Sequence, residues 1–416
     1  MLVPCRACNQ CASRGASRPR RGAAMAPDRP AQRDPVRGEV ILFVLAAAFL
    51  ALWTALSLQT MWRPGGVDIR VLGSFWAAGD NANRGLNPYG DSPLVPVVAT
   101  AAPASPGVIR VSDRNLNPPA WLPICQLLAL FDPARAAAVW LILTATIFAV
   151  GGFVLMADAP APLRSWMILC LLVSTPVLDT IFLGQNYGIL YLLGLVGWRS
   201  LQHGRPIAAS AAIGMLAAIK PNLLMWPALL FLSGQRKIAV LASAAFAMLS
   251  AFPLFLYGFR IYPEWLQVMR GDTHWAMPAD ISLVAVARRL GVAPVGIFLA
   301  ASLIVASAYL AWRTRPTKQQ TTVLALCAAI LGAPLAWGYY IVLLMPAMAD
   351  GMWGGWGFVG GILSLLPIRY APPAFMKSVW TPSLLTSIQL APFCIVFVHA
   401  AWQCLVTRHD NRRGEQ

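Results

Sequence analysis

Long apolar runs constrain this chain more than any other feature of its sequence. Hydrophobic residues make up 58% of the 416 residues and charged residues only 12%, whereas a soluble domain carries about a quarter charged residues. The runs are roughly 17–25 residues long, are rich in Leu and Ala, and lack the period-two alternation of a membrane β-barrel. We therefore expect an all-α polytopic membrane protein with about ten to twelve transmembrane helices.

The first predicted span runs from Val40 to Trp62, since Arg37 precedes it and Trp62 and Arg63 mark its far interface. Because the run is long enough to cross, we expect it to stay as a signal-anchor helix rather than to be a cleaved secretory signal. Further spans are predicted at 134–156, 165–183, 187–198, 206–219, 222–233, 238–257, 295–312, 321–334, 339–349, 353–367 and 384–405.

Three places in this pattern leave the path of the chain open. Pro221 and Pro334 each separate two adjacent short runs, so each pair is either a tight hairpin or one kinked helix. Ala120–Phe131 is apolar but too short to cross, which predicts a half-helix lying in the membrane or dipping into it.

Basic residues gather in the short loops that this assignment places on one side, at 158–164, 199–205, 234–237 and 313–318. Such loops stay on the cytoplasmic side. We therefore predict a disordered, Arg-rich cytoplasmic tail (1–38), a transmembrane domain (39–406) and a second cytoplasmic tail (407–416). The polar stretch at 63–119 is then a large first extracytoplasmic loop, facing the periplasm of a bacterial inner membrane or its equivalent. Loops 258–294 and 368–383 share that side, which we predict to be the working face.

The net charge of +16 is explained by topology. Eight arginines precede residue 39 and most other basic residues lie at span ends, so we expect membrane lipids as neighbours and no nucleic-acid partner. Cys5, Cys8 and Cys11 form a C-x-x-C-x-x-C pattern, but no fourth ligand is near, and we predict neither a metal site nor a cofactor. Met25, which opens MAPDRP, is an alternative start of translation.

Acidic residues are scarce, with 16 Asp and Glu in all. Asp68 lies just beyond the first span, near the headgroup plane, where a lipid-borne reactive group would also be found. A carboxylate placed there is suited to act as a general base, and Asp68 is our candidate catalytic residue. The alternative is a helix cap or a loop-folding Asp. Asp80 and Asp113 are the nearest rivals, followed by Asp91, Glu264, Asp272 and Asp280.

Lys220 lies between two apolar runs, near the predicted outer face. An ionisable residue at membrane depth points to function, and an ammonium suits a phosphate, although a snorkelling lysine at a helix end is the alternative. Arg270 and His274 belong to a basic, aromatic loop and are further candidates for donor-phosphate binding. A lone His is more often structural.

Two further groups are candidates for substrate binding. Gln185 and Asn186 interrupt an apolar hairpin, where a turn satisfied by its own amides is the alternative. Trp337, Tyr339 and Tyr340 are placed to stack on a sugar ring, and an interfacial aromatic belt explains them almost as well. Nucleotide-binding Gly-rich loops are absent from the sequence, so an activated donor would have to arrive through the membrane.

Four stretches resemble the membrane glycosyltransferases of family 87, in the GT-C superfamily. They are Asp68 with FWAAGDNANRGLNPYG, then LGQNYGILYLLGL, AAIKPNLLMWPALL and LGAPLAWGYYIVLLMP; DISLVAVARRL is a weaker fifth. The resemblance implies a GT-C-like bundle with a periplasmic active site. It also implies transfer of a sugar, often mannose, from a polyprenyl-phosphate donor to a lipid or glycan acceptor with inversion. Asp68 would be the base, and no metal is expected.

The sequence departs from the family pattern in three places. Asp68 stands further from FWAAG than expected, Gly338-Tyr339 replaces Asp-His, and Asp280-Ile281 replaces Asn-Gln. Besides a glycosyltransferase, a transporter or flippase of a lipid-linked sugar remains the alternative, although it would need polar residues through the whole membrane depth.

Overall fold

The computed structural model describes residues 37–63, 66–67, 70–92, 114–158, 172–271, 280–349 and 390–406. The regular structure in these ranges is helical, apart from two antiparallel two-residue strands, β1 (Trp62–Arg63) and β2 (Gly66–Val67). The all-α fold expected from the sequence is therefore confirmed. The helices are α1 (Arg37–Met61), α2 (Arg70–Asn83), η1 (Pro119–Trp121), α3 (Leu122–Leu128), α4 (Pro133–Asp158), α6 (Thr175–Leu183), α7 (Tyr187–Gln202), α8 (Pro206–Ile219), η2 (Pro221–Leu224), α9 (Met225–Leu232), α10 (Arg236–Tyr257), α11 (Ile261–Gly271), α12 (Leu283–Arg289), α13 (Ala293–Thr314), α14 (Lys318–Leu331), η4 (Gly338–Leu343), α15 (Met345–Ala349) and a last helix at Leu390–Val406.

Four of these helices, α1, α4, α10 and α13, are long and apolar enough to cross a membrane. Their outer surfaces carry large apolar side chains such as Phe255, 86% exposed, and Phe298, 70% exposed. Side chains of this kind are stable in lipid rather than water. The chain is therefore an integral membrane protein. The expected total of ten to twelve crossings stays a prediction, because the span expected at 353–367 lies outside the described residues.

Several segments differ in detail from what the sequence predicts. A short apolar helix is confirmed in place of a span at 120–131, since η1 and α3 together cover only Pro119–Leu128. Its position in the membrane stays a prediction. The span expected at 339–349 is not one α-helix, because the 3₁₀ helix η4 ends before α15 begins. The expected loop at 258–294 contains two helices, α11 and α12.

The chain reverses direction at Pro221, so the pair of short runs on either side of it is a hairpin. In α8, Ser210 Oγ donates to the carbonyl oxygen of Ile238, near the start of α10, and Gly214 lies against Ala242 further along it. Thus α8 runs beside α10 in the same direction. By contrast, α9 returns toward the start of α10, to which it is joined by residues 233–235.

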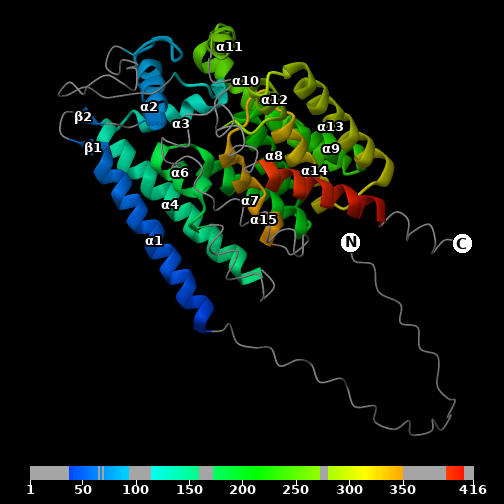
Figure 1. Cartoon of the computed structure of the whole chain (residues 1–416). Helices are drawn as coiled ribbons and strands as arrows, with labels where there is room; N and C mark the ends of the chain where they lie inside the picture. The colour runs from blue at the N-terminus through cyan, green and yellow to red at the C-terminus, as the bar shows by residue number, and fades with distance from the viewer. Residues whose placement is uncertain are drawn as a thin grey trace, which may run out of the picture.

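Figure 1 shows how these helices are arranged. The helices α1 and α4 lie side by side, while α2, α3 and α11 gather at the end where α1 ends. Aromatic edge contacts between Phe75, Trp121 and Trp140, with centroids 5.9–6.5 Å apart, join α2 to η1 and α4. At Gly79, a Cβ would fall 2.0 Å from the carbonyl oxygen of Cys125, so α2 packs directly on the backbone of α3.

Candidate active site

Asn117 is the centre of a buried polar cluster. Its Oδ1 accepts two hydrogen bonds, from Lys220 Nζ at 3.0 Å and from Asn186 Nδ2 at 3.1 Å. Its own Nδ2 and backbone N–H both donate to Asn115 Oδ1, and its carbonyl oxygen accepts from the hydroxyl of Tyr89 at 2.9 Å. Every polar atom of Asn117 is thus used, and the residue joins three distant parts of the chain.

The sequence N-L-N-P-P explains why Asn117 is available for this role. Two prolines in succession prevent the segment from continuing as a helix and keep the preceding residue extended. The 3₁₀ turn η1 starts only at Pro119. Residues 115–117 therefore stay outside regular structure, and Trp265 of α11 anchors them further by donating from its Nε1 to the carbonyl oxygen of Leu116 at 3.0 Å.

Lys220 enters the cluster because α8 ends immediately before it. Its backbone is extended, with φ −134° and ψ 92°, as expected before Pro221. Besides its bond to Asn117, the ammonium lies over the ring of Tyr187, 5.5 Å from the ring centroid. In the part of the chain that the structure describes, Lys220 forms no ion pair. Its positive charge is therefore held by an amide oxygen and an aromatic face, neither of which neutralises it.

Asn186 comes from the turn between α6 and α7. Gly184 makes this turn possible with φ +67°, a conformation that a side chain would strain. The Asn186 side chain is fully buried, and its Oδ1 has no hydrogen-bond partner among the described residues. Gln185, which precedes it, contributes its carbonyl oxygen to Trp140 Nε1 at 3.3 Å. The turn therefore supplies one amide to the cluster and leaves an acceptor unused.

The Tyr187 ring under the Lys220 ammonium belongs to a group of aromatic side chains. Tyr187 contacts Tyr339 and Tyr340 edge to face, with centroids 5.4 and 5.1 Å apart. Trp337 stacks on Tyr339 at 6.3 Å. These rings come from the N-terminus of α7 and from η4, so the predicted aromatic candidates are brought beside the predicted lysine.

Asp280 is buried and pairs with Trp337 in an isolated antiparallel β-bridge. Its Oδ1 accepts from the backbone N–H groups of Ser282 and Ala336, each at 2.9 Å, and its carbonyl oxygen accepts from Arg289 at 2.9 Å. The side chain is 0% exposed, and Oδ2 has no hydrogen-bond partner among the described residues. Burial raises the pKa of Asp280 to about 6.

The structure thus brings together Lys220, Asn186 and the three aromatic candidates Trp337, Tyr339 and Tyr340. Gln185 adjoins them through its backbone. Arg270, in contrast, is exposed in the last turn of α11, and no hydrogen bond or ion pair within the described ranges joins it to the cluster. Asp68 and His274 lie outside the described residues.

Besides Asp280, five rival acids were expected. Asp80 pairs with Arg84 at 3.0 Å and Asp91 with Arg114 at 2.8 Å. Glu264 lies in the first turn of α11, and Asp113 and Asp272 lie outside the described residues. Sequence reasoning did not select Asn115, Asn117 or Tyr187. The first two stand directly before a pair of prolines, but nothing in the sequence indicates that Asn117 pairs with Asn186 and Lys220.

Comparison with known families adds a decisive finding. The family model described as glycosyltransferase family 87 matches residues 115–346, more than half of the chain. The chain belongs to glycosyltransferase family 87. It is therefore a membrane glycosyltransferase, which uses a sugar donor and an acceptor. No curated protein matches the chain. The matched range begins at Asn115 and includes Asn117, Asn186 and Lys220, while Asp68 and Tyr89 precede it.

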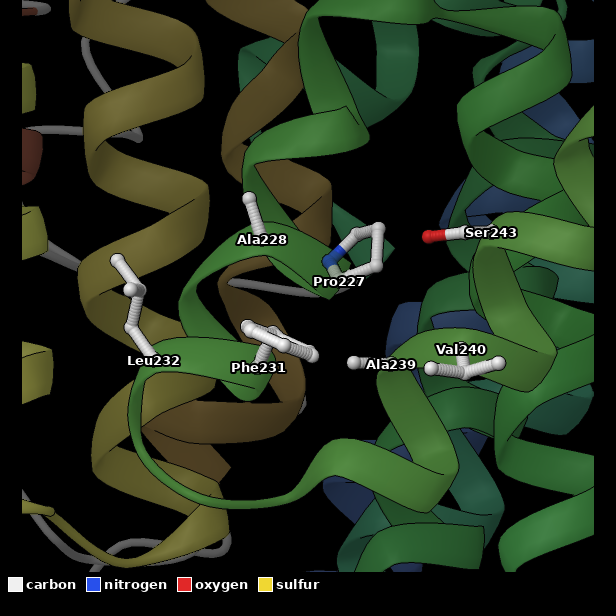
Figure 2. Close-up of a pocket in the computed structure, with 7 residues that line it drawn as sticks. All are labelled: Pro227, Ala228, Phe231, Leu232, Ala239, Val240 and Ser243. Atoms are coloured by element: carbon white, nitrogen blue, oxygen red, sulfur yellow. The ribbon is translucent and has the colours of Figure 1, made fainter.

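This family 87 glycosyltransferase also has an apolar pocket of about 520 Å³ between α9 and α10. Figure 2 shows its walls: Pro227, Ala228, Phe231 and Leu232 come from α9, and Ala239, Val240 and Ser243 come from α10. Ser243 is the one lining residue with a polar side chain. The pocket contains none of the cluster residues, but α9 follows Lys220 directly in the chain, after the short turn η2.

Proposed function

We propose that this glycosyltransferase moves a sugar, mannose or another hexose or pentose, from a polyprenyl-phosphate carrier to a lipid or glycan acceptor, with inversion. The observation that carries the proposal is the uncompensated ammonium of Lys220. A buried charge is costly unless a counter-charge or several hydrogen bonds support it. Lys220 has one amide acceptor and an aromatic face. A phosphate ester supplies the missing negative charge.

The apolar pocket supports a lipid-linked rather than a water-soluble donor. It begins at Pro227, seven residues after Lys220, which is roughly 10 Å along a helix. An isoprenoid chain attached to a phosphate beside Lys220 would find apolar walls within its first few units. The absence of a nucleotide-binding motif from the sequence agrees with such a donor.

The chemistry then needs one base and one phosphate site. The acceptor hydroxyl attacks the anomeric carbon from the face opposite the phosphate, and its proton passes to a carboxylate, for which Asp68 is our candidate. The bond between the anomeric carbon and the phosphate oxygen breaks, and both of its electrons leave with the polyprenyl phosphate. Lys220 stabilises the charge that develops on that leaving group. A phosphate leaving group requires no separate acid.

We place this reaction on the extracytoplasmic face, because the basic short loops favour the other side as cytoplasmic. The first test uses membranes or proteoliposomes containing the full chain, incubated with radiolabelled mannosyl polyprenyl phosphate. We expect a labelled glycoside in wild type, and loss of the product in Lys220→Gln and Asp68→Asn.

The matched control is Lys237→Gln, which removes an exposed lysine in the first turn of α10 and should leave the yield unchanged. Movement of the labelled lipid across the bilayer without any glycoside would overturn the proposal in favour of a flippase. Full activity in Asp68→Asn would transfer the role of base to another acid.

A further inference from the structure

One carboxylate oxygen of Asp280, Oδ2, is buried and has no hydrogen-bond partner among the described residues. The other, Oδ1, accepts hydrogen bonds from the Ser282 and Ala336 N–H groups. These bonds fasten the start of α12 to the strand-like segment before η4, where Ile281 N–H also donates to the carbonyl oxygen of Ala336 at 2.6 Å. An asparagine would make the same two bonds through its own Oδ1. The second oxygen and the negative charge therefore need another explanation.

The position of this oxygen relates it to the proposed donor site. Asp280 pairs with Trp337 in an isolated antiparallel β-bridge, and Trp337 stacks on Tyr339. Tyr339 in turn contacts the Tyr187 ring that Lys220 covers. The cation and the unpaired acceptor thus adjoin the same group of aromatic residues. A glycosyl phosphate is complementary to this pair. Its phosphate anion suits the cation, and the hydroxyl groups of its sugar ring can donate hydrogen bonds to the acceptor.

Asn186 provides a second idle acceptor in the same cluster. Its Nδ2 is bound to Asn117, while its Oδ1 is buried without a hydrogen-bond partner among the described residues. Buried acceptors in a native protein are nearly always satisfied, so two idle acceptors beside one uncompensated cation indicate a missing ligand that donates hydrogen bonds. A polyhydroxylated sugar meets this requirement.

We propose that Asp280 Oδ2 accepts a hydrogen bond from one hydroxyl of the sugar being transferred, and that Asp280 thereby determines which donor sugar is used. This inference rests on the proposed function. Because Asp280 is 0% exposed, the sugar reaches it only after a neighbouring side chain moves. The role is one of specificity, and the proton of the acceptor is taken elsewhere.

The test changes the protein and the substrate separately and together, as in a double-mutant cycle. Wild type and Asp280→Asn are compared with short-chain mannosyl prenyl phosphate and with a series of its monodeoxy analogues, each lacking one ring hydroxyl. In wild type we expect kcat/KM to fall roughly 10- to 100-fold for one analogue, as for loss of a hydrogen bond to a charged group. The quantity compared is the ratio of kcat/KM for the full donor to kcat/KM for each analogue. In Asp280→Asn the ratio for that one analogue should shrink to within about threefold of unity, while the ratios for the other analogues stay as in wild type.

Asp132→Asn is the control, because Asp132 is a half-exposed acid at the start of α4 whose Oδ1 accepts from Arg135 N–H, which an amide also allows. Its ratios should equal those of wild type. If Asp280→Asn turns over too slowly, the same ratios are taken from donor binding to the purified variant.

Three outcomes would overturn the inference. A wild-type enzyme that accepts every monodeoxy donor equally well refutes it without any variant. So does an Asp280→Asn protein with the wild-type ratio for each analogue, which would leave Asp280 a purely structural role. A wild-type protein that transfers no sugar from any prenyl phosphate would instead remove the proposed function, and this inference with it.

Discussion

Lys220 Nζ lies 3.0 Å from Oδ1 of Asn117, a residue 103 positions earlier in the chain. The bond joins the segment before η1 to the break between α8 and η2. The partner is an amide, which orients the ammonium without cancelling its charge. A carboxylate in the same place would form an ion pair and compete with any incoming phosphate.

Asn117→Asp tests this difference directly. The new carboxylate should pair with Lys220 and weaken donor binding, because a charge-assisted bond contributes about 1.5–3 kcal/mol. We expect KM for the prenyl-phosphate donor to rise at least tenfold, with a smaller change in kcat. Steady-state kinetics in detergent would measure both values.

The control for this change is Asn83→Asp, at an exposed position near the end of α2. It adds the same charge outside the cluster and should leave KM within about twofold of wild type. An unchanged KM in Asn117→Asp would show that Lys220 does not meet the donor phosphate.

The raised pKa of Asp280 gives a pH dependence of stability with a defined sign. Burial raises the pKa from 3.8 to about 6, so the folded protein binds this proton more tightly than the unfolded chain. The ionised carboxylate therefore lowers stability as pH rises from about 4 to about 7, by up to roughly 3 kcal/mol. Arg289 offsets part of this cost, whereas the nearby Tyr187 and Tyr340 are neutral in that range.

Asp280→Asn cannot ionise, so it should gain thermal stability relative to wild type across the same pH range. Melting temperatures measured in detergent between pH 4 and pH 8 would show how the difference between the two proteins grows with pH. Parallel curves for the two proteins at all pH values would contradict a raised pKa at this position.

Filling the apolar pocket should affect long donors more than short ones. Ser243→Trp places a large side chain between α9 and α10, where the isoprenoid chain is proposed to lie. We expect kcat/KM to fall roughly tenfold for a long-chain donor and little for a donor with one or two isoprene units. The reason is that each methylene group the pocket no longer buries costs binding free energy, and the long chain has more of them. Ala244→Trp, exposed on the same helix and not part of the pocket, is the matched control. Equal losses for both chain lengths would remove the pocket from the donor path.

Gly79→Ala should loosen the end of the bundle that holds the candidate site. The added Cβ would meet the carbonyl oxygen of Cys125 at 2.0 Å, so α2 or α3 must shift. We expect a loss of about 1–3 kcal/mol in stability, as for other overpacked contacts, with reduced activity because α3 follows Asn117. Gly271→Ala, where the structure shows nothing within 4 Å, should have little effect on the melting temperature.

The sequence predicted the class of fold and most members of the candidate site, since apolar length and rare polar residues are visible without coordinates. Lys220 and Asn186 stood out because each interrupts an apolar run. Asn117 did not, because its importance comes from long-range pairing with both of them. Asp280 was recognised as an acid, but its buried second oxygen depends on how the segment at Ala336 packs against it.

The shorter helices were harder to predict for a related reason. Residues 339–349 are apolar like a span, yet η4 interrupts them, since Tyr339 and Tyr340 are held by the N-terminus of α7. Tertiary contact decided the local conformation there, which a hydropathy pattern does not register. In contrast, the end of α8 just before Lys220 follows from Pro221 alone.

Each polar atom of Asn117 already has a hydrogen-bond partner, which holds Asn117 in place while the proposed phosphate departs. The lysine is long and flexible, so it can swing toward product and then return to the same fixed oxygen. Each catalytic cycle would consequently end with the cation re-docked where the next donor must find it, without any rebuilding of the main chain.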